Sequence, residues 1–379
     1  MAFTRPLTLA QLRGYAVARS LFTPTTLPAA LRKMGYVQAD PIRAPSRAQD
    51  LILRHRVKDY HDGDLERRYP RLDIEEDALH NYGFLHRELQ ALLHPRSIPH
   101  RLRVEREHPK LIQPVLDFVR ANGPTHPRDL DRDHGRQSVT NYWGGTSSAA
   151  THILDLLHYR GALRVARRDN GVRVYAEATH HSPMAAGGLE DSESVSRLIG
   201  HLVNLYAPLP EASLRQLTLM LRYGAPHFHA RLRDRTPLKL LIASGRLREH
   251  KLDSVNWIVP GIEKMCVDAP RVARLLAPFD PVVWDRRRFE MLWGWRYRFE
   301  AYTPPAKRQL GYYALPLLWC DQVIGWANLK YDGDRLEAEI GFALTRPREA
   351  AFKRELEAEL ERIREFLKVA KVARILFRR

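Results

Sequence analysis

The stretch Gly161-Ala162-Leu163-Arg164-Val165-Ala166-Arg167-Arg168-Asp169-Asn170-Gly171-Val172-Arg173-Val174-Tyr175 decides the fold of the middle of the chain. Two segments that alternate apolar and polar residues flank Asn170-Gly171, a dipeptide that suits the left-handed backbone of a two-residue hairpin turn. Upstream, apolar residues at helical spacing predict three helices, over 111–119, 127–130 and 147–158. Three helices followed by a hairpin predict a winged helix.

The same order of elements returns further along the chain. Helices are expected over 195–206, over 212–221 and within 226–244, followed by a second hairpin over 245–259. Gly161 and Gly245 occupy equivalent places after the third helix of each set. We therefore expect a divergent structural repeat of two winged helices, too irregular to form a solenoid.

The two ends of the chain have different patterns. Near the N-terminus, helices are expected over 7–21 and 27–34, and the segment 35–41 should stop the second helix, run extended and then turn. Segments rich in aromatic and β-branched residues predict a small antiparallel sheet or barrel near the other end: 289–302, 311–320, 323–331 and 336–344. An amphipathic helix is expected over 347–377.

The predicted fold class is therefore α+β, with tandem winged-helix domains, a small C-terminal β domain and a terminal helix. The expected division of the chain is 1–105 for an N-terminal winged-helix-like domain, 106–190 for the second winged helix, 191–262 for the third, 263–345 for the β domain and 346–379 for the amphipathic helix.

Composition excludes several classes of protein. No apolar run approaches the length of a membrane span, and the N-terminal segment lacks the apolar core of a signal peptide. Only Cys266 and Cys320 occur, so a disulfide framework and a cysteine zinc site are excluded. The pairs His180-His181 and His227-x-His229 have no matched acidic or cysteine partners. We expect a cytoplasmic, nucleoid-associated protein with no metal and no cofactor.

The charge of the chain indicates a polyanionic partner. Lys and Arg number 61 against 44 Asp and Glu, which gives a net charge of +17. Arginine forks suit phosphate oxygens and guanine. The predicted first hairpin carries four arginines that are candidate contacts to DNA: Arg164, Arg167, Arg168 and Arg173. The alternative is a basic hairpin that is merely solvated.

Three blocks of sequence resemble one family, the YcaQ/AlkX-like winged-helix DNA glycosylases related to AlkZ, which act in alkylpurine and interstrand-crosslink repair. The first block is 31–42 with 46–51, and it contains Gln38-Ala39-Asp40, similar to the Gln-x-Asp catalytic segment of the family. The second is the longer run 276–286, Leu-Ala-Pro-Phe-Asp-Pro-Val-Val-Trp-Asp-Arg. The third is 302–308 with 311–317.

The resemblance implies a monofunctional DNA glycosylase for cationic N7-alkylated purines, with interstrand crosslinks as a further candidate substrate. It implies that Asp40 stabilises the oxocarbenium-like sugar and serves as general base, while Gln38 orients water or sugar. Alkylation at N7 makes the base a good leaving group, so no strong acid is required. Arg47, Lys307 and Arg308 lie in the resembling blocks and are further candidate DNA contacts.

The same residues also allow structural and non-catalytic interpretations. Asp40-Pro41 is also a common turn initiator. The run Glu75-Glu76-Asp77 is interpreted as a helix start rather than a two-metal site. Winged helices usually serve regulation, so the alternative function is a non-catalytic DNA-binding protein or transcriptional regulator. The sequence contains no leucine heptad repeat that would indicate a dimer. We therefore expect a monomer that binds double-stranded damaged DNA.

Overall fold

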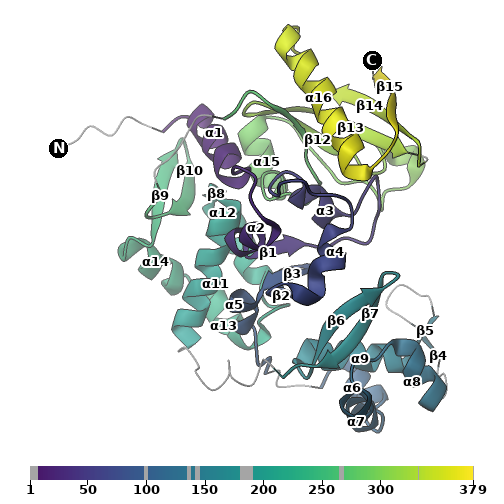
Figure 1. The fold of residues 1–379 in the computed structure, drawn as a ribbon. Helices are drawn as coiled ribbons and strands as arrows, with labels where there is room; N and C mark the ends of the chain where they lie inside the picture. The colour runs from purple at the N-terminus through teal and green to yellow at the C-terminus, as the bar shows by residue number, and fades with distance from the viewer. Residues whose placement is uncertain are drawn as a thin grey trace. The chain divides into compact units, whose positions relative to one another are not determined.

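The computed structural model describes residues 7–97, 101–134, 138–140, 146–179, 191–263, 269–331 and 333–378 (Figure 1). The chain forms two compact units. Unit 1 comprises residues 1–65, 199–217 and 238–379, and unit 2 comprises 66–198 and 218–237. Since each unit is assembled from separated stretches of chain, neither corresponds to a continuous segment. The five-segment division expected from the sequence stays a prediction.

Unit 1 contains both ends of the chain. Its helices are α1 (Leu9–Ser20), α2 (Leu27–Met34), α3 (Ala48–Leu53), α15 (Arg286–Trp293) and α16 (Ala350–Leu367), with the short helix η3 (Pro305–Lys307). Its strands are β1 (Tyr36–Gln38), β8 (Leu209–Pro210), β9 (Leu247–Leu252), β10 (Val255–Pro260), β11 (Ala273–Leu275), β12 (Leu315–Trp319), β13 (Gln322–Tyr331), β14 (Arg335–Phe342) and β15 (Lys371–Phe377).

A five-stranded sheet dominates the C-terminal part of unit 1. Its strand order is β11-β12-β13-β14-β15, in which β14 and β15 run parallel and the other neighbours antiparallel. Helix α1, helix α15 and the sheet share an apolar core that includes Leu12, Phe289 and Trp293. In the described residues the two edge strands do not pair with each other, so the sheet is open rather than a closed barrel.

Two expectations for this region were wrong. The predicted helix over 347–377 ends at Leu367, where Lys368 adopts the left-handed conformation (φ +56°), and the rest becomes β15. The β-branched and aromatic residues after Lys371 pair with β14, which overrides the helical pattern. The segment 289–302 does not start as a strand either. Asp285 caps the N-terminus of helix α15 and Gly294 (φ +74°) ends it.

Unit 2 contains the predicted first set of three helices and its hairpin. The elements are η1 (Tyr69–Arg71), β2 (Ile74–Ala78), β3 (Tyr82–His86), α5 (Arg87–Ala91), α6 (Arg103–Glu107), α7 (Ile112–Asn122), α8 (Pro127–His134), β4 (Ser138–Thr140), β5 (Thr146–Ser148), α9 (Ala149–Arg160), β6 (Leu163–Asp169), β7 (Val172–Glu177), η2 (Pro226–Phe228) and α13 (His229–Arg233). Asn170 (φ +50°) and Gly171 (φ +84°) form the two-residue turn between β6 and β7, as their sequence predicts.

The second set of elements also follows the predicted order. Helix α11 (Asp191–Tyr206), helix α12 (Glu211–Met220), the short α13 and helix α14 (Thr236–Ala243) precede the hairpin β9–β10. The chain passes between the units within α11, α12 and α14, and also within α4 (Asp64–Arg68). Gly161 (φ +86°) and Gly245 (φ +73°) each follow the last helix of their set in a left-handed conformation, which explains the repeated glycine.

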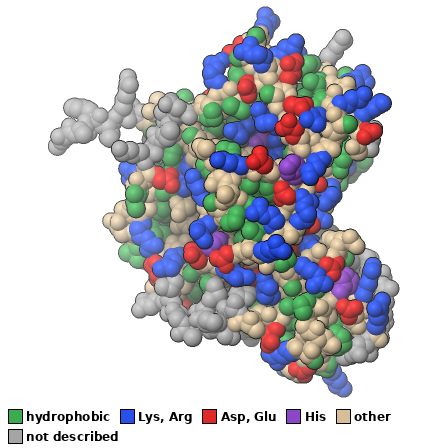
Figure 2. All heavy atoms as spheres, in the orientation of Figure 1, with side chains coloured by type: hydrophobic (Ala, Val, Ile, Leu, Met, Phe, Trp, Pro, Cys, Tyr) green, Lys and Arg blue, Asp and Glu red, His purple; other side chains and the backbone are tan. Residues whose placement is uncertain are grey.

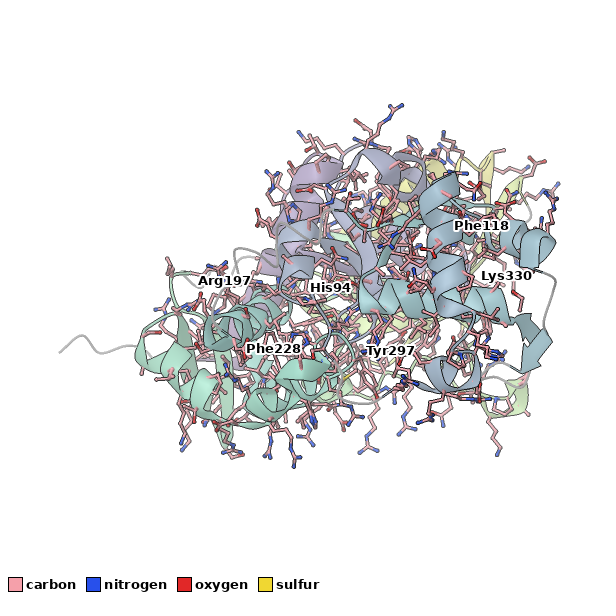
Figure 3. All side chains as sticks on the ribbon, turned by 90° about the horizontal axis from the view of Figure 1, so that it is seen from below. His94, Phe118, Arg197, Phe228, Tyr297 and Lys330 are labelled. Carbon is pink, nitrogen blue, oxygen red and sulfur yellow. The ribbon has the colours of Figure 1, made fainter. Side chains whose placement is uncertain are left out.

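The acidic run Glu75-Glu76-Asp77 was expected to start a helix, and this was wrong. The three residues lie on strand β2, and each is only about 1% exposed. Asp77 is held by Arg96 and His94, both at 2.7 Å (His94 is labelled in Figure 3). Although burial opposes it, the charge of Arg96 keeps the pKa of Asp77 well below its ordinary value. Pairing with cations therefore allows three carboxylates to be buried on one strand.

Basic side chains do not gather into a single patch on the face that Figure 2 shows. Figure 2 shows Lys and Arg side chains interspersed with acidic ones on the visible face. Within the described part of the chain, no helix is long and apolar enough to cross a membrane.

A buried ion pair holds three segments of unit 1 together. Arg56 donates both of its terminal nitrogens to the carboxylate of Asp280, at 2.8 and 2.9 Å, and both side chains are fully buried. The same guanidinium donates to the backbone carbonyls of Ser20, at the end of α1, and Ile52, on α3. The segment after α3 is thereby fixed to α1 and to the run 276–286.

We predict that Arg56→Met lowers the free energy of unfolding by about 3–5 kcal/mol, because it leaves the Asp280 carboxylate buried without a partner. Urea unfolding of the full chain measures the change. Arg103→Gln is the control, since the exposed pair Arg103–Glu107 within α6 should contribute less than about 0.5 kcal/mol. An equal effect of both substitutions would contradict the structural role of the buried pair.

Candidate active site

The segment that carries Gln38 and Asp40 is positioned by the end of helix α2. Thr26 caps the start of this helix, and Gly35 ends it in the left-handed conformation (φ +68°). A Cβ atom on residue 35 would lie 2.3 Å from the ring of His201, so only glycine fits there. Strand β1 follows directly, with all three residues buried. The chain therefore enters the site at a fixed angle.

Gln38 is oriented by a tryptophan from the second resembling block. The indole Nε1 of Trp284 donates to the side-chain carbonyl oxygen of Gln38 at 2.9 Å, across 246 residues of sequence. The ring of Trp284 also packs on Tyr206, with 5.2 Å between the ring centroids. This hydrogen bond identifies the carbonyl end of the amide and so fixes the orientation of the Gln38 side chain.

Asp40 is a buried carboxylate with few neutralising contacts. Its side chain accepts one hydrogen bond from the backbone N–H of Ile42 at 2.9 Å, and its own backbone N–H donates to Gln49 at 3.3 Å. The residue is only 9% exposed. Burial raises the pKa of Asp40 above its ordinary value, and the hydrogen bond from Ile42 opposes this only in part. A carboxylate in such a setting is a stronger base than a solvated one.

Tyrosines of the third resembling block lie within the electrostatic reach of Asp40. Burial, followed by the charge on Asp40, raises the pKa of both Tyr302 and Tyr313. Tyr302 is 75% exposed, whereas Tyr313 is buried. Phe299 joins them, with ring centroids 6.0 Å from Tyr302 and 5.1 Å from Tyr313. Near the carboxylate, Tyr302 therefore presents an exposed aromatic ring and Tyr313 a buried phenol.

The hydroxyl of Tyr313 has no hydrogen-bond partner among the described residues. A buried hydroxyl without a partner costs free energy, so this group is a candidate for contact with a ligand. The resembling block contains Tyr313, yet sequence reasoning gave this residue no role, just as it gave none to Trp284. Both side chains reach the site from far along the chain, and only their membership of long resembling blocks could have suggested it.

The three candidate DNA contacts from the resembling blocks lie on the same unit as Asp40. Arg47 precedes helix α3, and its charge lowers the pKa of Asp50 slightly, against a larger effect of burial. Arg308 stacks over the ring of Tyr312 at 5.0 Å and donates to the carbonyl of Thr303 at 2.8 Å. Lys307 is exposed at the end of η3. Contact with DNA stays a prediction for all three.

The hairpin arginines are engaged within unit 2. Arg164 binds Glu75 with two nitrogens at 2.8 and 3.0 Å, and Arg168 binds Glu76 at 2.5 and 2.8 Å. Arg167 lies apart from them and pairs with the exposed Asp169 at 2.9 Å. Arg173 pairs with Asp155 at 2.7 Å. Arg164 and Arg168 therefore share a face that neutralises buried acids, and their predicted contacts with DNA would compete with those pairs.

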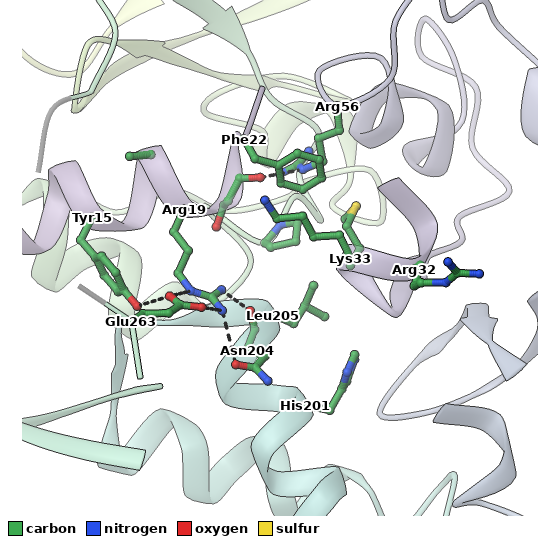
Figure 4. A pocket seen from close by; sticks show the side chains of 14 residues that line it. Tyr15, Arg19, Phe22, Arg32, Lys33, Arg56, His201, Asn204, Leu205 and Glu263 are labelled. Atoms are coloured by element: carbon green, nitrogen blue, oxygen red, sulfur yellow. Dashed lines mark hydrogen bonds and ion pairs between the residues drawn. The ribbon is translucent and has the colours of Figure 1, made fainter. Parts of the chain in front are cut away.

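Unit 1 contains a cavity that is not lined by Gln38 or Asp40. Its volume is about 630 Å³, and Figure 4 shows Arg19 and Glu263 paired on its wall, with a nitrogen-to-oxygen distance of 2.6 Å. Tyr15 donates to the same carboxylate at 2.7 Å. The cavity is not the candidate active site, because neither residue of the Gln-x-Asp segment lines it. Within the described residues, no cluster of His, Cys, Asp and Glu could hold a metal ion.

Comparison with known proteins defines the class. A family model described as "DNA glycosylase AlkZ-like" matches residues 31–366. Among solved structures, the Streptomyces sahachiroi DNA glycosylase AlkZ is similar with a TM-score of 0.63 at 15% identity, over 99% of this chain and 100% of that chain. The class is therefore the DNA glycosylases, enzymes that bind DNA and act in its repair. The chain belongs to the AlkZ-like family, and the solved structure supports a shared mixed α+β fold.

We predict that Arg164→Ala and Arg168→Ala each lower the stability of the protein by several kcal/mol, because each leaves a buried glutamate without its main partner. Arg167→Ala serves as the control and should cost less than about 1 kcal/mol, since its ion pair is exposed. Urea unfolding measures the differences. Equal stabilities of the three variants would show that the buried pairs do not hold the hairpin.

We also predict an acid limb in the pH–rate profile that lies above the ordinary aspartate pKa of 3.8, because the raised pKa of Asp40 leaves less of the ionised base as pH falls. The free energy of unfolding changes with pH in the opposite direction to the rate. A carboxyl whose folded pKa is raised stabilises the fold at low pH and loses this contribution as pH rises through the folded pKa. Asp40→Asn should therefore be at least as stable as the wild type at pH 7.

A second carboxyl could contribute to the same limb. Burial raises the pKa of Asp50 to about 6, against a hydrogen bond from Tyr60. The profile of Asp50→Asn separates the two groups. If this variant lost the acid limb, the limb would belong to Asp50 and not to Asp40.

Proposed function

We propose that the protein is a monofunctional glycosylase that hydrolyses the N-glycosidic bond of cationic N7-alkylated purines in double-stranded DNA, acting as a monomer. Interstrand crosslinks joined through the same position of guanine are a further substrate of the proposal. The observation that carries it is a buried, weakly neutralised carboxylate, Asp40, beside an amide whose orientation is fixed by Trp284.

The chemistry of the substrate matches this carboxylate. An alkylated purine carries a positive charge that weakens its bond to the sugar, so the base leaves without a strong acid. Positive charge then develops on the sugar, where an ionised Asp40 in a poorly solvated setting stabilises it. The same carboxylate takes the proton of the attacking water, and the side chain of Gln38 orients that water or the sugar.

Two further features support hydrolysis over other reactions at this site. No lysine occurs between Gln38 and Asp50, so a Schiff base with the sugar has no local nucleophile. The phenol of Tyr313 stays protonated because burial and Asp40 raise its pKa. It can therefore donate a hydrogen bond to the bound nucleotide or to water without competing as a base.

We propose that the two sets of three helices followed by a hairpin act as winged helices that hold the duplex. The exposed Arg167 suits a phosphate contact better than Arg164 or Arg168, which hold buried acids. A regulator would use the same elements without needing Asp40. The family places the chain among glycosylases, and the catalytic test below addresses the alternative directly.

The test is base release from a duplex that contains N7-methylguanine. Asp40→Asn should lower the single-turnover rate by about 10²–10⁴-fold while DNA affinity stays near that of the wild type, because the amide is nearly isosteric but cannot accept the proton. Asp59→Asn is the matched control. Asp59 is exposed in a left-handed conformation (φ +49°) that asparagine also accepts, so this variant should retain full activity. Turnover of Asp40→Asn at the control rate would reject the proposal.

A further inference from the structure

A second cavity of unit 1 carries a concentration of positive charge. Its volume is about 450 Å³, and its walls include Arg286, Arg296, Arg298 and Lys307. Arg286 is the first residue of α15, Arg296 and Arg298 lie on the irregular segment after α15, and Lys307 is the last residue of η3. All four side chains belong to exposed residues. The cavity is therefore open to a ligand from solution.

The acidic groups near this cavity are already engaged. The carboxylate of Glu300, which also lines it, accepts backbone N–H groups of Gln309, Leu310 and Gly311, at 2.8–3.2 Å. Glu290 pairs with Arg296 at 3.0 Å.

The remaining three cations that line the cavity are Arg286, Arg298 and Lys307, and among the described residues none of them forms an ion pair like that of Arg296 with Glu290. Several cations that converge on one hollow without acids of their own favour binding of an anion. A phosphate group suits the planar fork of an arginine and the point charge of a lysine.

The cavity borders the candidate active site. Phe299 lines the cavity, and the same ring contacts Tyr302 and Tyr313, which lie within the electrostatic reach of Asp40. One aromatic side chain thus separates the basic hollow from the tyrosines of the site. A nucleotide whose sugar lies at Asp40 has a phosphate attached directly at its 5′ oxygen and another at its 3′ oxygen.

We propose that this cavity binds a phosphodiester group of the DNA backbone next to the damaged nucleotide, through Arg286, Arg298 and Lys307. The inference rests on the proposed function for the identity of the neighbouring nucleotide. Free inorganic phosphate has the same chemistry of recognition, so the experiment must distinguish the two sources.

The test compares Arg298→Gln and Lys307→Gln with Arg354→Gln, which removes one charge from an exposed position of α16 that is not part of the cavity. Affinity for a duplex with a stable abasic analogue is measured from low salt to 1 M. Each cavity variant should reduce the slope of log K against log salt by about 1. Binding should weaken by about eightfold at 0.1 M salt and remain unchanged near 1 M.

The control variant Arg354→Gln should keep both the wild-type slope and the wild-type single-turnover rate at saturating enzyme. If the cavity variants matched Arg354→Gln in slope and affinity, the proposal would be overturned. Because the ligand is not cleaved, this outcome is independent of whether Asp40→Asn loses base release.

A second experiment uses inorganic phosphate as a competitor of the duplex. At matched ionic strength, phosphate and chloride should displace the duplex equally from the wild type if the cavity recognises the DNA backbone as a polymer. If phosphate displaced the duplex more strongly, with this excess lost in Arg298→Gln while the salt slope for DNA stayed unchanged, the cavity would be a site for free phosphate. That result would also overturn the proposal.

Discussion

The ion pair between Arg56 and Asp280 is the constraint on which the candidate active site depends. A carboxylate and a guanidinium with no solvent access are tolerated only when every polar atom is satisfied, and Arg56 achieves this with two bonds to Asp280 and further bonds to the carbonyls of Ser20 and Ile52. Asp280 is four residues from Trp284, which orients Gln38. The long block 276–286 is therefore chiefly an internal support that brings the indole to the site.

Local sequence patterns predicted much of the fold. The turn at Asn170-Gly171 and the glycines that end α9 and α14 require left-handed backbone, and this requirement is legible in the sequence itself. The acidic strand β2 was not predictable in this way, because its burial depends on arginines far along the chain. Strand β15 was not predicted for the same reason, since its helical sequence pattern is overridden by pairing with β14.

The residues of the candidate site also fall into those that the sequence could suggest and those that depend on distant contacts. Gln38 and Asp40 could be proposed from the resemblance of one short segment to a family, while composition alone gave only a polyanionic partner. The contributions of Trp284, Tyr302 and Tyr313 arise from contacts that span more than 240 residues, as the separation between Gln38 and Trp284 illustrates. The hairpin arginines show what sequence reasoning missed, since two of the four also neutralise buried glutamates, while their contact with DNA stays a prediction.

The discontinuity of unit 1 has a consequence for synthesis of the protein. The segment with Gln38 and Asp40 leaves the ribosome early, but Trp284, Tyr313 and the closing strand β15 leave it late. All of unit 2 is encoded between them and can fold while translation continues. An incomplete nascent chain would therefore carry the carboxylate without the groups that position it. The arrangement delays assembly of the candidate active site until nearly the whole polypeptide has been made.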